Sequence, residues 1–390
     1  MQWQFSTRYS LWLKTSLTVN GGTLMARFLK YGITTGASAA AAAKAALIAL
    51  LKEPVDRVVI PTPIGLRFEV PVKSSRKLAN DTAEAIVVKD AGEDIDATNK
   101  MEITAIVKLT GDGKITIKSG KGIGKVTKLG LQVSIGESAI NPVPRSMITA
   151  AVKEVLPAGK GVEVTISAPE GENIAKKTLN AKLGIVGGVS ILGTTGVVKP
   201  LSLEACRRSL VPQIDVALAR GYQRIFFVPG NIGEKIAKQQ FNAPEDAIVQ
   251  TGDFMGYMLD KAVEKGVKEI ILLGHSGKLV KLAANIFNTH HKVADARNEV
   301  IASYAGAVGA DTKTINALLQ ANTSEEGSEI LKRADLLEAT FERIAQRVSQ
   351  RVSDRVENKI KISVIIVSMD GKVLGMDENA RCNKPWLNLT

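Results

Sequence analysis

Short runs in which apolar and polar residues alternate dominate the first half of the chain. Alternation with a period of two predicts strands that bury one face. The alanine-rich stretch that ends near Leu51 predicts a helix, since alanine is the best helix former. A second helix is predicted over 144–156. We therefore expect an α+β domain over residues 25–180, with strands at 57–60, 66–72, 84–90, 101–109, 114–119 and 161–169.

The second half has a different rhythm. Longer apolar runs, each preceding or following a helical stretch, lie at 183–192, 224–229, 246–251 and 269–274. This order predicts a mostly parallel sheet with crossover helices. We expect a Rossmann-like α/β domain over residues 181–376. Within it, the charged segment 325–358 predicts a surface helix, and 359–376 predicts a pair of strands.

Neither end of the chain carries such a pattern. Residues 1–24 contain scattered aromatic residues, have no clear period and lack the apolar core of a signal peptide. We expect either a flexible N-terminal arm or a misassigned start, and the sequence leaves both open. Residues 377–390 are expected to form a loose tail.

Composition narrows the class of protein. No apolar stretch approaches the roughly 18–20 residues that span a bilayer, and two cysteines fit a reducing compartment. We therefore expect a cytoplasmic protein that binds no membrane; a homo-oligomer is compatible with this. The net charge of +12 favours an anionic partner. Because long Lys/Arg blocks are lacking and aromatic residues make up only 4%, an acidic metabolite is favoured over nucleic acid.

All three histidines lie in one window, residues 274–297. His275 ends a predicted strand, and Lys278 and Lys281 follow one turn apart on the next helix. Because α/β proteins build ligand sites at such strand ends, His275 is a candidate catalytic residue. His290, Asp295 and Arg297 have two explanations: they form an ion-pair or capping cluster, or they belong to the active site. No zinc pattern is present, so we expect no protein-bound metal.

Four further segments carry candidate chemistry, and each also has a purely structural explanation. The start of the alanine helix either presents N–H groups to an anion or is a capped core helix. A glycine-rich run after 183–186 either cradles a cofactor or packs tightly. The acidic turn 90–96 either supplies acid and base groups or is solvated, and the proline-containing loop 130–148 is either functional or a strut. Their candidate residues are Thr34, Thr35, Gly36, Gly187, Gly188, Gly193, Thr194, Thr195, Gly196, Asp94, Glu137, Asn141 and Arg145.

Taken in order, these segments resemble the cobalt-precorrin-5B C1-methyltransferase family of the anaerobic cobalamin pathway. The matching segments cover roughly residues 30–310 and are 31–44, 88–98, 130–145, 183–202, 229–234 and 274–297. The resemblance implies methyl transfer from S-adenosylmethionine to ring carbon C1 of a cobalt tetrapyrrole, giving cobalt-precorrin-6A. The cobalt then belongs to the substrate. Ala37-Ser38 stands where the family commonly has Thr-Cys, which excludes a thiol role there.

The resemblance and the chemistry together suggest a division of the candidate residues. We expect the basic residues, with their neighbours, to bind the carboxylate arms of the macrocycle. His275 is expected to orient the ring, ligate cobalt or move a proton. The competing hypotheses are a basic RNA-binding protein and a phosphate-handling α/β enzyme. For the substrate we expect Thr34, Thr35, Gly36, Asp94, Glu137, Asn141, Arg145, Lys278, Lys281, His290, Asp295 and Arg297, and for the cofactor Gly187, Gly188, Gly193, Thr194, Thr195, Gly196, Gly230 and Asn231.

Overall fold

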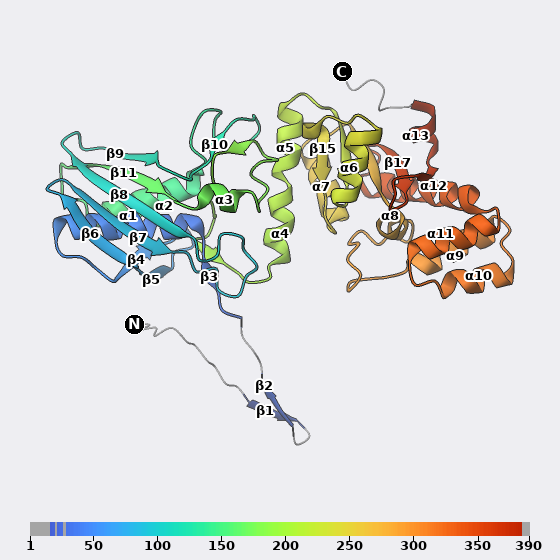
Figure 1. Ribbon diagram of the computed structural model, residues 1–390, viewed down its shortest axis with the longest axis horizontal. Coiled ribbons are helices and arrows are strands. Elements are labelled where there is room, and N and C mark those ends of the chain that lie inside the picture. The colour runs from blue at the N-terminus through green and yellow to red at the C-terminus, as the bar shows by residue number, and fades with distance from the viewer. Residues whose placement is uncertain (1–15, 20–21, 26–28, 384–390) are drawn as a thin grey trace. The chain divides into compact units, whose positions relative to one another are not determined.

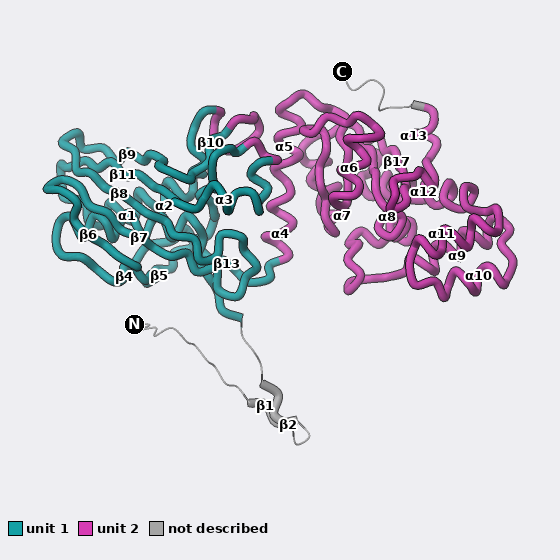
Figure 2. Tube along the Cα trace, viewed as in Figure 1, with its two compact units in different colours: residues 1–126, 136–181, 185–202 teal, residues 127–135, 182–184, 203–390 magenta. Residues whose placement is uncertain are grey.

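The computed structural model describes residues 16–19, 22–25 and 29–383. The chain divides into two compact units (Figure 2). Unit 1 runs to residue 126 and adds 136–181 and 185–202, whereas unit 2 comprises 127–135, 182–184 and the chain from 203 onward. Most of the predicted N-terminal extension, and residues 384–390 of the predicted tail, lie outside the described residues. The described part of that extension holds β1 (Ser16–Val19), paired antiparallel with β2 (Gly22–Met25).

Unit 1 is built on a five-stranded sheet of order β6-β7-β8-β11-β9 (Figure 1). Neighbours are antiparallel except β11 and β9, which are parallel. On β7, alternate residues are buried, as the period of two predicts. The strands are β6 (Ser74–Ala79), β7 (Thr82–Val88), β8 (Glu102–Thr110), β9 (Ile115–Ser119) and β11 (Gly161–Ser167).

Helix α1 (Thr35–Leu51) is the centre of the unit 1 core. Its alanines from Ala37 to Ala46 are fully buried. Because these side chains are small, β7, β8 and α2 (Pro142–Lys153) all pack closely around the helix. A Cβ atom on Gly36 would lie only 2.9 Å from Cγ of Pro144 in α2. The remaining elements are short: β3 (Gly32–Ile33), β4 (Arg57–Pro61), β5 (Arg67–Pro71), β10 (Lys125–Val126), α3 (Gly171–Ala175), β12 (Ile185–Val186) and β13 (Val197–Val198).

The apolar run 183–192 does not form the continuous strand that its composition predicts. Only β12 is regular, and Val189 and Ile191 then make single bridges to other segments. Gly187 and Gly193 have φ angles of 81° and 124°, which interrupt an extended chain. From residue 185 onward the run lies in unit 1, where Val189 and Ile191 are core residues. Its apolar character therefore reflects core packing.

Unit 2 contains a second five-stranded sheet, of order β15-β14-β16-β17-β18. The first four strands are parallel, and β18 is antiparallel to β17. The protein is thus a mixed α/β protein with parallel and antiparallel sheets. The strands are β14 (Arg224–Val228), β15 (Ile248–Gln250), β16 (Glu269–His275), β17 (Lys361–Val367) and β18 (Val373–Met376).

Both faces of this sheet are buried, which explains why its strands are continuously apolar. Phe227 and Leu272 belong to one core cluster, with helices that include α7, α8 and α12. Phe226 and Leu273 belong to the opposite cluster, with α6 and α13. The helices are α4 (Leu203–Leu210), α5 (Pro212–Ala219), α6 (Asn231–Gln240), α7 (Met255–Glu264), α8 (Ser276–Ala283), α9 (Arg297–Ala307), α10 (Thr312–Leu319), α11 (Ser324–Arg333), α12 (Leu337–Arg355) and α13 (Glu378–Asn383), with a 3₁₀ turn at Glu245–Ala247.

Two predictions for the C-terminal part are wrong. The single surface helix over 325–358 is two helices, and α12 buries Phe341, Ile344 and Val348 against the sheet. Its many charges obscured an apolar stripe with helical spacing. The predicted loose tail begins instead with buried Asp377 and α13. Among the described residues, none of the helices is long and apolar enough to cross a membrane.

Candidate functional site

The predicted site residues of unit 2 gather at one edge of the parallel sheet. β14 ends before Gly230, β15 ends before Asp253, and β16 ends at His275. Because neighbouring parallel strands have their carboxyl ends at the same edge, these three positions face one side of the sheet. β14 lies between β15 and β16 in the sheet. The next strand along the chain, β15, is therefore on one side of β14, and the strand after it, β16, is on the other side. Such a reversal of strand order is where open α/β sheets bind ligands.

His275 caps helix α8, and its ring is held from both sides. Its Nδ1 accepts a hydrogen bond of 3.2 Å from the backbone N–H of Gly277. Nε2 of the same ring is hydrogen-bonded to the Glu325 carboxylate. Glu325 was not predicted, because it lies on α11, 50 residues further along the chain. Both ring nitrogens of His275 are thus engaged within the protein.

Lys278 and Lys281 fasten the segment 284–296 to α8. Nζ of Lys278 lies 2.5 Å from Oδ1 of Asp253, which also accepts from the Thr289 hydroxyl at 3.0 Å. Burial alone would raise the pKa of Asp253, but these partners hold that pKa below its ordinary value. Lys281 is only 3% exposed, and its Nζ donates to the Thr289 and Ala294 carbonyls at 3.3 and 2.9 Å.

The remaining candidates of the histidine window form local contacts. The rings of His290 and His291 stack with centroids 4.6 Å apart. Oδ1 of Asp295 lies 3.4 Å from Nζ of Lys281 and its Oδ2 lies 3.6 Å from Nη2 of Arg297, so these ion pairs join Asp295 to Arg297 and Lys281, whereas the ring of His290 accepts from the Lys292 N–H. Within the ranges that the structure describes, no three His, Cys, Asp or Glu side chains are placed to hold a metal ion.

The loop after β14 carries an accessible glycine. Gly230 is extended, and a Cβ atom added to it would have nothing within 4 Å. Oδ1 of the next residue, Asn231, accepts from Nε2 of Gln250 at 2.8 Å. A Cβ atom on Gly233 would lie 2.8 Å from the Leu273 carbonyl oxygen, so α6 packs with its backbone against the strands. The loop is therefore anchored on both sides of an accessible glycine.

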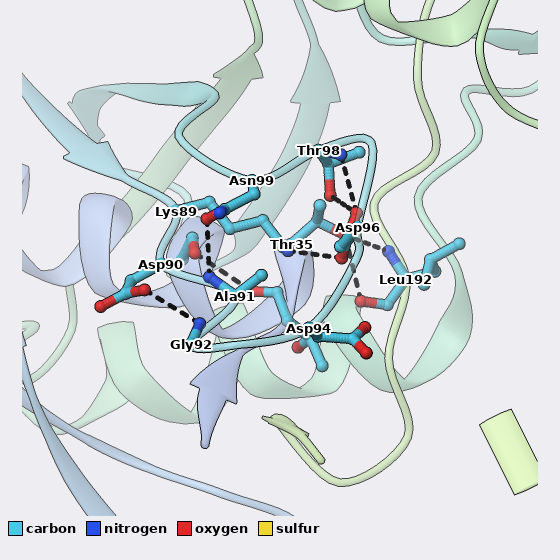
Figure 3. A network of polar contacts seen from close by, with 12 residues as sticks. Thr35, Lys89, Asp90, Ala91, Gly92, Asp94, Asp96, Thr98, Asn99 and Leu192 are labelled. Carbon is cyan, nitrogen blue, oxygen red and sulfur yellow. Dashed lines mark hydrogen bonds and ion pairs between the residues drawn. The ribbon is translucent and has the colours of Figure 1, made fainter. Parts of the chain in front are cut away.

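In unit 1, protein atoms surround the first turn of α1 (Figure 3). The Thr34 hydroxyl caps the helix by accepting from Ala37 N–H at 3.2 Å. The Gly36 N–H donates to the Leu192 carbonyl at 3.0 Å, and the Thr35 hydroxyl accepts from Leu192 N–H at 2.8 Å. Thr34, Thr35 and Gly36 are all buried. An anion at this helix end would have to displace the Leu192 carbonyl.

The acidic turn is fixed by a buried lysine that the sequence analysis did not single out. Lys89 is 1% exposed, and its Nζ lies 2.6 Å from Oδ2 of Asp96 (Figure 3). Burial by itself raises the pKa of Asp96, but Lys89 and the Thr98 hydroxyl and N–H hold that pKa below its ordinary value. Oδ1 of Asp94 accepts from the backbone N–H of Leu201 at 2.8 Å. The available signal was a lysine at the end of an apolar strand, just before a run of acidic residues.

Close packing explains most glycines of the glycine-rich run, whereas Gly187 has a left-handed φ of 81° and nothing within 4 Å of an added Cβ atom. A Cβ atom on Gly188 would lie 2.1 Å from the Gly122 carbonyl oxygen, and one on Gly193 would overlap the Thr34 side chain. Thr195 bonds through its hydroxyl to the backbone of Val197, two residues on, while Thr194 is exposed. A Cβ atom on Gly196 would lie near Met147 and Thr62. These residues lie in unit 1.

The remaining candidates of unit 1 lie in the loop before α2 and in the first turn of that helix. Asn141 precedes the helix without a side-chain cap, and Glu137 is exposed. Nε of Arg145 donates to the Ile140 carbonyl at 2.9 Å. Arg145 and Lys153 border a shallow depression of about 340 Å³ along α2, together with Ser146, Thr149 and Ala150.

Comparison with known proteins identifies the family. The model of the CbiD family matches residues 23–200, and that of the CbiD C-terminal domain matches 288–378. A cobalt-precorrin-5B C(1)-methyltransferase of Methanocaldococcus jannaschii is 52% identical over 348 residues, covering 89% of this chain and 96% of the relative. The chain belongs to the CbiD family. A relative of the same name from Moorella thermoacetica is 45% identical, over 92% of this chain and 97% of its own.

The family membership confirms the resemblance found in the sequence. The CbiD family matches fall on unit 1 and on the C-terminal part of unit 2. The strand ends at Gly230 and His275 lie between these two matches, and an alignment covering 89% of the chain includes them. A crystal structure of the cobalamin biosynthesis protein CbiD from Archaeoglobus fulgidus is 31% identical, covering 70% of this chain and 86% of its own, with a TM-score of 0.38.

Proposed function

We propose that this protein transfers a methyl group from S-adenosylmethionine to ring carbon C1 of cobalt-precorrin-5B, giving cobalt-precorrin-6A, in anaerobic cobalamin biosynthesis. The observation that carries the proposal is the 52% identity, over nearly the full length of both chains, to a relative named for this reaction. The relatives reported above share that name, which favours this function over RNA binding or phosphate chemistry.

For the methyl donor we propose the edge of the parallel sheet beside Gly230 and Asn231. The strand order supports a Rossmann-like use of the sheet, because the accessible glycine follows β14 at the reversal of order. Close packing accounts for Gly188, Gly193 and Gly196 of the other glycine-rich run, and a left-handed backbone accounts for Gly187, so we favour the 229–234 loop over it.

S-adenosylmethionine supplies an activated methyl group, whose bond to sulfur breaks, leaving the electron pair on sulfur, as the bond to C1 forms. The protein's task is then mainly placement. We assign His275 a positioning role, since one nitrogen caps α8 and the other is bonded to Glu325. Lys281, buried and bonded to two carbonyls, positions the segment 284–296. For the carboxylate arms we propose Arg145, which lies beside exposed Lys153.

The experiment combines reconstitution with one designed variant. Purified protein, cobalt-precorrin-5B and methyl-labelled S-adenosylmethionine should give a tetrapyrrole heavier by one methyl group. Gly230→Val should weaken S-adenosylhomocysteine binding, measured by calorimetry, at least roughly tenfold. The extended backbone at residue 230 accepts valine, so the melting temperature should stay unchanged.

The matched control is Gly111→Val, since that glycine also has nothing within 4 Å of an added Cβ atom and lies in unit 1. It should bind S-adenosylhomocysteine as the wild type does. Absence of any labelled product with intact wild-type protein would overturn the proposed reaction. Equal affinity of wild type and Gly230→Val would overturn only the location of the cofactor.

A further inference from the structure

Three aliphatic side chains are exposed on unit 1, on segments that meet around the first turn of α1. Ile95 is 91% exposed, Leu201 57% and Leu192 48%. The backbone of Leu192 is bonded to Thr35, and that of Leu201 to Asp94, the neighbour of Ile95. We call these three residues the aliphatic surface. Fixed, exposed aliphatic residues in one neighbourhood are typical of a binding site.

The backbone beneath this surface is held rigidly. Both the N–H and the carbonyl of Leu192 are hydrogen-bonded to the start of α1 (Figure 3). Ile95 lies between Asp94 and Asp96, whose carboxylates are both bonded. Leu201 has a φ of 53°, a conformation that costs a non-glycine residue energy. The backbone that carries the three side chains is therefore preorganised for a ligand.

Cations border the aliphatic surface. Lys199 lies two residues before Leu201, and Lys100 follows Asn99, whose Oδ1 accepts from the N–H of Ala91 in the acidic turn at 3.0 Å. Both lysines are exposed, and neither side chain forms an ion pair with another of the residues that the structure describes. The surface thus has an apolar centre and a positive margin.

We propose that the aliphatic surface holds one face of the cobalt tetrapyrrole, with carboxylate arms of the macrocycle reaching Lys100 and Lys199. A planar ring with anionic arms matches an apolar centre with a cationic margin. Three side chains offer far less than the roughly 800 Å² that each partner buries in a stable protein interface, which favours a small ligand over a protein. This inference rests on the proposed function and assigns its substrate a place.

The test measures binding of a stable probe, cobalt uroporphyrin III, to the full-length protein from the change in its visible absorbance. Ile95→Asn and Leu192→Asn should each weaken binding roughly tenfold, and the double variant more, because each removes apolar area that the ring covers. Leu78→Asn is the matched control: that residue is 47% exposed on β6, and its substitution should change the affinity less than about twofold. Lys100→Gln with Lys199→Gln should reduce the dependence of binding on salt.

The same preparations should be assayed for methyl transfer to cobalt-precorrin-5B. KM for the tetrapyrrole should rise in the Ile95 and Leu192 variants, while affinity for S-adenosylhomocysteine stays at the wild-type value. If the variants bind the probe as tightly as the wild type and the wild type transfers methyl, the inference is wrong and the proposed function stands. If the wild type neither binds the probe nor transfers methyl, both are overturned.

Discussion

Replacing Asp96 by asparagine tests whether the buried lysine holds the acidic turn. The change keeps the shape of the side chain and its hydrogen bonds with Thr98 in place, but removes the negative charge 2.6 Å from Nζ of Lys89. Lys89 is 1% exposed, so its ammonium would remain in the interior without a counter-ion. The perturbation therefore isolates one buried charge.

The expected cost is about 3 kcal/mol of unfolding free energy. Removing one partner of a buried ion pair typically costs about 3–5 kcal/mol. The lower end applies because the Asp96 side chain is 24% exposed, which lets water approach the lysine. For a unit of this size, each kcal/mol lowers the melting temperature by about 2–4 °C, so the unit 1 transition should fall by about 6–12 °C.

Scanning calorimetry of the full chain, following the transition of unit 1, measures the effect. Lys89→Met in the Asp96→Asn background should restore most of the loss, because no charge is then buried alone. Glu163→Gln is the control: it breaks an exposed pair with Lys118 in the same unit and should cost under about 1 kcal/mol. A loss below about 1 kcal/mol for Asp96→Asn would refute the reasoning.

The same pair predicts how stability depends on pH. The pKa of Asp96 is lower in the folded protein than its usual value, about 3.9 in an unfolded chain. Its contribution is therefore complete above the unfolded pKa and is lost as the pH falls through the folded pKa. Melting of the wild type and of Asp96→Asn should converge in acid; a constant difference down to the lowest accessible pH would contradict this linkage.

Two further predictions concern helix α1 and the segment after α8. Thr34→Ala removes the cap of α1 and should lower the free energy of unfolding by about 1 kcal/mol, measured by urea unfolding. The control is Thr194→Ala, which removes an exposed hydroxyl of unit 1 and should change that free energy hardly at all. Lys281→Met removes two hydrogen bonds to the carbonyls of Thr289 and Ala294, so amide exchange in 284–296 should accelerate. Unchanged exchange there would show that Lys281 does not hold the segment.

Local patterns predicted elements whose burial follows a simple period. The strands at 57–60 and 101–109 correspond to β4 and β8, and the alanine helix ends at Leu51 as expected. The secondary structure of the run 183–192 could not be predicted from its composition, because an irregular core segment is as apolar as a buried strand. Only the backbone conformation at Gly187 and Gly193 separates the two.

In the candidate site, the positions of residues could be predicted from neighbouring residues, whereas contacts between distant segments could not. The position of His275 at a strand end followed from the residues around it. Its bond to Glu325 joins residues 50 apart and leaves no pattern in either segment. Similarly, spacing placed Lys278 and Lys281 on one helix, but Lys278 pairs with Asp253, after β15, and Lys281 bonds to carbonyls of 284–296. Sequence therefore located the groups, whereas their partners required the tertiary structure.

The interrupted course of the chain has a consequence for its synthesis. Residues 127–135 and 182–184 belong to unit 2, although most of that unit begins at residue 203. Lys128 pairs with Asp246 at 2.5 Å, and Lys182 with Glu234 at 2.9 Å. During synthesis on the ribosome, Lys128 therefore cannot form this pair until 118 more residues, up to Asp246, have been added. A fragment beginning at residue 203 would leave each acidic residue with one cation fewer, so the two units are best produced as one continuous polypeptide.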